Sequence, residues 1–106
     1  MTQADLFTAL KATGYPVAYS HFKTTANPPY IVYLFAYDSD LKADNTNYVE
    51  ISNFQIELYT GTKDLTAEAK IQTALKNLGL TYTKSETWLE NEELFQILYE
   101  VQIIGE

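Results

Sequence analysis

Two strand-like stretches decide the fold of this chain: Asn27-Pro28-Pro29-Tyr30-Ile31-Val32-Tyr33-Leu34-Phe35-Ala36-Tyr37 and Asn53-Phe54-Gln55-Ile56-Glu57-Leu58-Tyr59-Thr60. The first is apolar at every position from Tyr30 to Tyr37, so both faces of the predicted strand need cover. Because strand side chains alternate, one face is expected to carry Ile31, Tyr33, Phe35 and Tyr37, and the other Tyr30, Val32, Leu34 and Ala36. We interpret this strand as the central one of a sheet. The two prolines before it cannot donate backbone hydrogen bonds and belong at its entry.

The second stretch alternates between apolar and polar residues. Phe54, Ile56 and Leu58 are expected to point inward, with Asn53, Gln55, Glu57 and Tyr59 outward. This pattern is typical of a strand with one face in water. Between the two stretches, residues 38–47 are polar and lack any period, which predicts a long, mobile loop.

Length and composition indicate one folded domain spanning residues 1–106. The chain has 106 residues, of which 46% are hydrophobic and 20% charged, as in ordinary globular proteins. A chain of this size buries roughly two-thirds of its unfolded surface. Its nine tyrosines suit a protein interface, where Tyr is enriched, and equally suit half-buried strands.

The net charge of the chain disfavours some classes of binding partner. Seven basic and fourteen acidic residues give a formal net charge of −7, which disfavours binding to the outside of nucleic acid or to an anionic membrane. The chain has no cysteine, so disulfides, thiolate catalysis and cysteine-ligated zinc are absent, as suits a reducing cytoplasm. No signal peptide is expected at the N-terminus, and no apolar stretch approaches the ~20 residues that span a bilayer.

Two helices and a hairpin complete the predicted elements. Thr2 is a candidate N-cap for a helix from Thr2 to Thr13, and a short strand from Tyr15 to Phe22 follows. Either Asp64 or Thr66 caps a second helix that ends before Gly79. Its apolar face comprises Ile71, Ala74, Leu75 and Leu78, and its solvated face Glu68, Lys70, Gln72, Lys76 and Asn77. The last two strands are expected at 80–88 and 94–103, joined by an acidic turn at 90–93.

Together, the predicted helices and strands indicate an α+β fold in the order α-β-β-β-α-β-β. We expect a mainly antiparallel sheet of four to five strands with two helices packed on one face. Two helices of this length cover one side of such a sheet but hardly both, so another molecule is expected to meet the rest.

Catalytic chemistry is poorly supported. His21 is the only histidine, and its neighbour Ser20 is expected on the opposite face of a strand, where the two cannot form a nucleophile-base pair. The acidic clusters at 38–44 and 90–93 do not fit the EF-hand spacing and are best interpreted as solvated charge. The four glycines stand singly, so no phosphate-binding loop is present. No enzyme activity, metal site or cofactor is predicted.

Several segments together resemble a known family. They are 15–22 (YPVAYSHF), 28–33 (PPYIVY), the polar loop at 43–45, 53–60 (NFQIELYT) and 84–88 (KSETW). In this order they are similar to tail-completion, tail-terminator or head-tail joining proteins of long-tailed phages and prophages of low-GC Gram-positive bacteria. The likeness covers most of the chain, and it rests on the combination of these structural motifs.

The resemblance implies a fold like that of the phage lambda tail terminator. Such proteins form a ring, generally hexameric, on the head-proximal end of the tail tube, stop its polymerisation and offer a docking surface to the connector. The implied partners are other copies of the chain in the ring, the tail-tube protein and the head-tail connector protein, with DNA only passing through the lumen. The free chain is expected as a ring or as a monomer. The implied location is the tail-head junction of the virion, after assembly in the host cytoplasm, with no membrane or small-molecule substrate.

An assembly interface is the expected functional site. The candidate residues are those of the polar loop and two exposed aromatics: Tyr37, Asp38, Asp40, Lys42, Asp44, Asn45, Asn47, Tyr59 and Trp88. The loop is hypothesised to be mobile in the free subunit and to order on contact. The alternatives are a connector-stopper or minor tail protein of the same neck, an acidic DNA-mimic inhibitor, and a small hydrolase.

Overall fold

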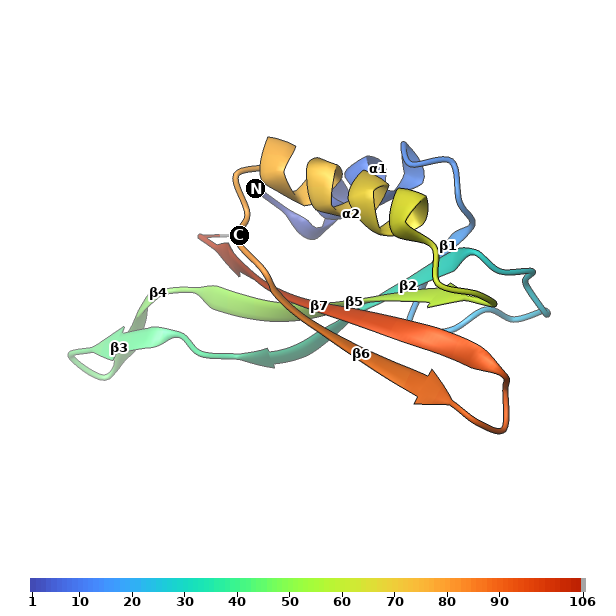
Figure 1. The fold of residues 1–106 in the computed structure, drawn as a ribbon. Coiled ribbons are helices and arrows are strands. Elements are labelled where there is room, and N and C mark those ends of the chain that lie inside the picture. Colours follow the sequence, from blue (N-terminus) through green and yellow to red (C-terminus); the bar gives the residue numbers. More distant parts are fainter. Residues whose placement is uncertain (106) are drawn as a thin grey trace.

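The computed structural model describes residues 1–105 as a layer of two helices on one face of a five-stranded sheet, with a two-stranded arm beyond it (Figure 1). The α+β prediction is confirmed. The elements in chain order are α1 (Gln3–Lys11), β1 (Val17–Tyr19), β2 (Tyr30–Asp38), β3 (Leu41–Ala43), β4 (Thr46–Val49), β5 (Ile51–Thr60), α2 (Leu65–Asn77), β6 (Thr83–Leu89) and β7 (Leu94–Ile104).

The sheet has the strand order β1-β2-β5-β7-β6. Only β1 and β2 are parallel, and the other neighbours are antiparallel, so the prediction of a mainly antiparallel sheet is confirmed. The middle strand is β5, which pairs with β2 on one side and β7 on the other. The prediction that Tyr30–Tyr37 forms the central strand was therefore wrong, because the long C-terminal hairpin extends the sheet on the far side of β5.

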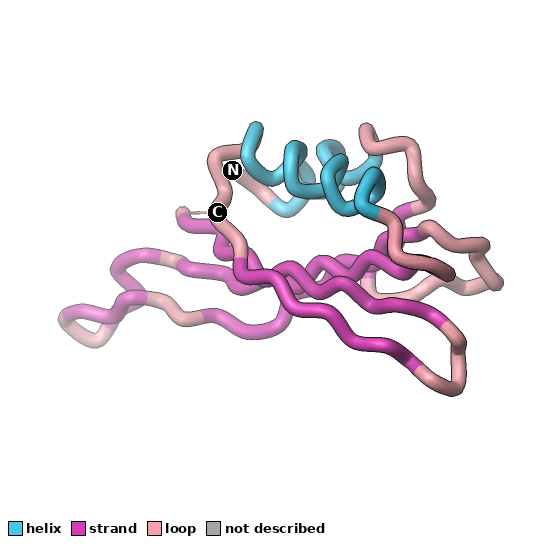
Figure 2. The backbone as a smooth tube through the Cα atoms, in the orientation of Figure 1, coloured by secondary structure: helices cyan, strands magenta, loops and turns pink. Residues whose placement is uncertain are grey.

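Both helices lie on the same side of the sheet, as predicted (Figures 1 and 2). Thr2 caps α1 through a reciprocal pair of hydrogen bonds with Asp5, a capping box, and Leu6 and Leu10 face the sheet and are fully buried. Asp64 caps α2 by accepting a hydrogen bond from the Ala67 N–H at 3.0 Å. Of the two expected caps, Asp64 is thus the one used.

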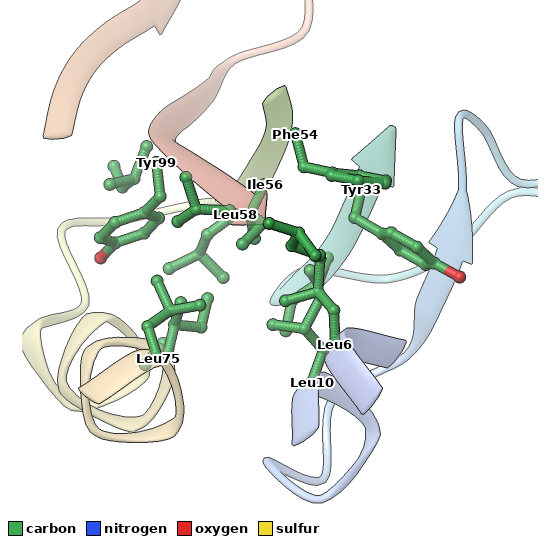
Figure 3. Packing of buried hydrophobic residues seen from close by; sticks show 14 residues of the cluster. Leu6, Leu10, Tyr33, Phe54, Ile56, Leu58, Leu75 and Tyr99 are labelled. Carbon is green, nitrogen blue, oxygen red and sulfur yellow. The ribbon is translucent and has the colours of Figure 1, made fainter. Parts of the chain in front are cut away.

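The core fills the space between the helices and the sheet (Figure 3). Phe54, Ile56 and Leu58 of β5 point into it, which confirms the predicted inward face of this strand. The last strand contributes Ile97, Tyr99, Val101 and Ile103, and α2 contributes Ile71 and Leu75. Burial of these large side chains is the main stabilising contribution. The side of the sheet turned away from the helices is called the open face below; it carries Val32, Gln55, Glu57, Tyr59, Ser85 and Gln96.

The predicted alternation of side chains along β2 holds in the first part of the strand but not at its end. Residues 31–33 are buried, whereas Phe35 and Tyr37 are 42% and 57% exposed. The register with β5 shifts between Phe35 and Tyr37, so Phe35 lies opposite the inward Phe54 but Tyr37 lies opposite Asn53 on the open face. The bulge reverses the alternation, and Tyr37 therefore does not share the face of Ile31 and Tyr33.

Glu68 lies in the core side of α2, contrary to its predicted place on a solvated face. Its carboxylate is held between Lys63 Nζ at 2.7 Å and Lys84 Nζ at 2.6 Å, and its side chain is only 3% exposed. Lys63 also pairs with Glu86. Burial alone would raise the pKa of Glu68, but the hydrogen bonds and charges of Lys63 and Lys84 outweigh it and hold this pKa below its usual value.

Candidate assembly interface

The segment expected to be a mobile loop is a β-hairpin arm. β3 and β4 pair antiparallel, with Lys42 opposite Asn47 and Ala43 opposite Thr46, and the ribbon extends beyond the end of the main sheet (Figure 1). The two turn residues, Asp44 and Asn45, have φ values of 51° and 60°. Positive φ at both positions is typical of a two-residue hairpin turn, and Asp and Asn tolerate it well. The loop prediction was wrong because this turn signal was not recognised.

Asp40 fastens the base of the arm. Its carboxylate accepts hydrogen bonds from the Ile51 N–H at 2.8 Å and from Asn47 Nδ2 at 2.6 Å. It thereby joins the incoming connection to β4 and to the start of β5. Ser39 N–H adds a backbone bond to the Ile51 carbonyl at 2.8 Å.

Asn53 forms a second attachment from the sheet. It is 8% exposed, and its Nδ2 donates to the Tyr37 carbonyl at 3.1 Å and to Ser39 Oγ at 2.9 Å. Its Oδ1 accepts from Gln102 Nε2 at 3.0 Å, so β7 also supports the junction. Asn53 was expected to face water as a plain polar residue, but it is part of this network. The arm is built into the fold, and an ordering step on contact is not needed to explain how it forms.

Removal of the Asp40 side chain should loosen the arm without unfolding the domain. In Asp40→Ala, we expect amide exchange from Leu41 to Val49 to accelerate about tenfold, because a hydrogen bond to a charged group contributes roughly 1.5–3 kcal/mol. Hydrogen-exchange mass spectrometry measures this directly. Asp38→Ala is the matched control, since it removes the same charge from an exposed neighbour. Equal exchange in both variants would show that Asp40 does not hold the arm.

Large apolar side chains are exposed along the arm and its base. Tyr48 is 72% exposed, Tyr37 57% and Leu41 56%. Between residues 38 and 50 the chain carries Asp38, Asp40, Asp44 and Glu50 against the single Lys42. This combination of exposed aromatic and aliphatic groups with acidic rims is typical of a protein-binding surface.

The structure brings together seven of the nine predicted interface residues. Tyr37, Asp38, Asp40, Lys42, Asp44, Asn45 and Asn47 all lie in the arm or at its base. Tyr59 and Trp88 lie at the other end of the sheet, beside residues 95 and 96 of β7. These two do not share a face, because Tyr59 is opposite Gln96 and Trp88 is opposite Phe95.

Tyr59 belongs to an aromatic group on the open face. Its ring stacks on Tyr30 with centroids 5.0 Å apart, and Tyr30 in turn meets Phe22 edge to face at 5.4 Å. The Tyr59 hydroxyl donates to Glu57 Oε1 at 2.8 Å and accepts from Gln96 Nε2 at 2.9 Å. Burial, followed by the hydrogen bond to Glu57, raises the pKa of Tyr59 to about 12. This phenol therefore stays neutral and serves packing.

Trp88 is exposed on the helix side of β6. It packs edge to face on Phe95 with centroids 4.8 Å apart, and its Nε1 donates to Glu90 Oε2 at 2.8 Å. Its exposed fraction is 43%. It shares a face with Lys84 and Glu86, because all three occupy alternate positions of one strand.

Ser20 and His21 are close, contrary to the prediction that they point apart. β1 ends at Tyr19, and Ser20 has a φ of 67°, so the strand alternation does not apply to the pair. His21 Nδ1 lies 3.3 Å from Ser20 Oγ at the rim of an open-face groove of about 520 Å³. Within residues 1–105, no carboxylate hydrogen-bonds the His21 ring to orient it. The pair therefore lacks the third member of a nucleophilic triad.

Among residues 1–105, no group of three or more His, Cys, Asp or Glu side chains is arranged to hold a metal ion. Neither α1 nor α2 has the length and apolarity needed to cross a bilayer. Comparison with models of known protein families finds no match, and comparison with curated proteins finds no significant relative.

Proposed function

We propose that this chain is a structural virion protein that caps the head-proximal end of a phage tail tube. In this role it terminates tube polymerisation and provides the interface for head-tail joining. It acts by contact and not by catalysis, and its partners are copies of itself in a ring, the tail-tube protein and the head-tail connector.

The preformed arm is the observation that carries the proposal. A ring requires two different complementary patches on each subunit, because its contacts are heterologous. The arm supplies one such patch at one end of the molecule, with Leu41 and Tyr48 exposed on it and Tyr37 exposed at its base. The molecule measures 49 × 28 × 25 Å, so the arm carries these side chains away from the compact body. The open face at the opposite end of the sheet, where Tyr59 lies, is available for a different neighbour.

Light scattering of the chain mixed with purified tail-tube protein tests whether the two proteins bind each other. We expect the mixture to form particles heavier than either protein alone, because the arm surface binds the tube end or a neighbouring subunit seated on it. A parallel mixture with connector rings separates the capping role from a connector-stopper role. Particles formed only with connector rings would contradict tube capping and favour the stopper. If neither mixture forms heavier particles, the proposal is wrong.

A further inference from the structure

The outer strand β6 presents the long unpaired edge of the main sheet. It pairs only with β7, and residues 83–88 are all exposed. At the opposite edge, β1 has three residues, follows Pro16 and precedes the left-handed Ser20. Beyond β1, the Phe35 N–H of β2 is already bonded to the Tyr19 hydroxyl at 3.1 Å. The free N–H and C=O groups of β6 are therefore the main place where another strand can add to this sheet.

The edge of β6 lacks most of the usual protection. Natural edges are shielded by charged side chains, prolines, bulges or short length, and β6 is seven residues long, without a proline or a register shift. The two charges of β6 are already engaged with the helix side: Lys84 with Glu68 and with Gln72 Oε1 at 2.9 Å, and Glu86 with Lys63. The alternate positions, on the open face, hold the uncharged residues Thr83, Ser85 and Thr87.

The sequence of this edge is complementary to itself. Residues 82–88 are Tyr-Thr-Lys-Ser-Glu-Thr-Trp, with Ser85 at the centre. If two copies pair antiparallel about Ser85, Lys84 lies opposite Glu86 of the second copy and Thr83 opposite Thr87. Tyr82 then lies beside Trp88 of the second copy. Directly opposed ionic, β-branched and aromatic residues are the pairs that stabilise antiparallel strands.

We propose that two copies of this chain form a dimer through antiparallel β6-β6 pairing centred on Ser85. The two-fold axis stands perpendicular to the sheet, so the two sheets join into one of ten strands and both helix layers lie on the same side. The interface is isologous, as in most protein dimers.

The charges also select this register. A two-fold axis that keeps both helix layers on one side can instead pass through Lys84 or Glu86, but each of those places like charges directly opposite each other. Only the Ser85 centre sets each lysine against a glutamate. In that register Lys84 lies between Glu68 of its own chain, 2.6 Å away, and Glu86 of the other. The intrachain ion pairs thus extend across the dimer with alternating sign.

The aromatic ends of the strand support the same arrangement. Trp88 is 43% exposed and rests on Phe95, and Tyr82 rests on Tyr99 with ring centroids 5.4 Å apart. Each ring keeps its own packing partner and gains one ring from the second copy. Pairing therefore covers the large exposed aromatic of β6 without rearranging the domain. The dimer uses the edge far from the arm and stands independently of the proposed tail-capping role.

A charge-complementation experiment tests the dimer and its register together. The wild-type chain should sediment at twice its 12.1 kDa mass. Ser85→Lys and Ser85→Glu each put like charges opposite each other at the centre, and each should weaken self-association about tenfold or more. An equimolar mixture of the two variants should restore the dimer, because the introduced ammonium then faces the introduced carboxylate. Gln55→Lys, on the open face but away from the edge, is the matched control and should remain dimeric.

Disulfide capture gives a second readout. Because the chain has no cysteine, Ser85→Cys places a single thiol at the proposed axis, and oxidation should link two copies there. Circular dichroism confirms that each variant is folded. Wild-type chain that sediments as a monomer at every concentration would overturn the proposal. So would a mixture of the lysine and glutamate variants that dimerises no better than either alone, since position 85 would then not face itself.

Discussion

Deletion of residues 41–46 should abolish tail capping while leaving the domain folded. The deletion removes β3, the hairpin turn and the start of β4, and it contains no residue of the hydrophobic core. Asp40 and residues 47–50 still connect Ser39 to Ile51, and five residues is a common hairpin loop length. We therefore expect an unfolding free energy within about 1 kcal/mol of the wild type, since loop length changes stability only weakly.

Electron microscopy of assembling tails measures the loss of capping. With the shortened chain, tubes should reach uncontrolled lengths and fail to join heads. Tyr48→Ser combined with Leu41→Ser keeps the hairpin but removes its exposed apolar groups, and should reduce capping about tenfold or more. Leu65→Ser is the matched control, because Leu65 is 69% exposed on α2, away from the arm. Normal capping by the shortened chain would exclude the arm as the contact.

The second large effect concerns the buried carboxylate of Glu68. Replacing both Lys63 and Lys84 by methionine leaves this carboxylate in the core side of α2 without a cation. Loss of the partners of a buried charge costs about 3–5 kcal/mol, and we expect an effect near the lower end because both lysines are partly exposed. Urea unfolding at pH 7 measures it. Lys23→Met with Lys76→Met is the control for the lost charges.

The pH dependence of stability should reverse in the same variant. In the wild type the lysines hold the pKa of Glu68 below its unfolded value, so its contribution is present above that value and is lost as the pH falls through the folded pKa. Without the lysines, burial raises the folded pKa above the unfolded one. The double variant should then gain stability as the pH falls from 7 to 5. If the variant instead loses stability over that range, other groups stabilise the charged carboxylate of Glu68 in place of the two lysines.

Much of this fold is predictable because its long elements have clear periods. The alternation from Phe54 to Leu58 fixed the inward face of β5, and Thr2 marked the start of α1. Glu68 was misplaced although a signal existed: it precedes Ile71 by three residues and Leu75 by seven, which puts it on the buried face of the helix. Because Glu68 is charged, it was predicted to lie on the solvated face. It is buried because Lys63 and Lys84, which lie outside the helix, pair with its carboxylate.

The local structure of the candidate interface was predicted wrongly from the sequence. The polar composition of residues 38–47 suggested a loop, whereas the Asp44-Asn45 turn and the Asp40 carboxylate make it a hairpin. The bulge that turns Tyr37 onto the open face depends on pairing with β5 and has no local signature. The contact between the Ser20 and His21 side chains likewise has no local signature, because it depends on the left-handed backbone conformation of Ser20.

The length of tail tubes grown with increasing amounts of this chain tests the capping proposal most directly. Purified tube protein is polymerised alone and with the chain, and tube lengths are read from electron micrographs. We expect tubes to shorten as the chain is added, with density for a ring at one end only. Tubes of unchanged length with bare ends, formed while the chain stays folded in solution, would contradict the proposal.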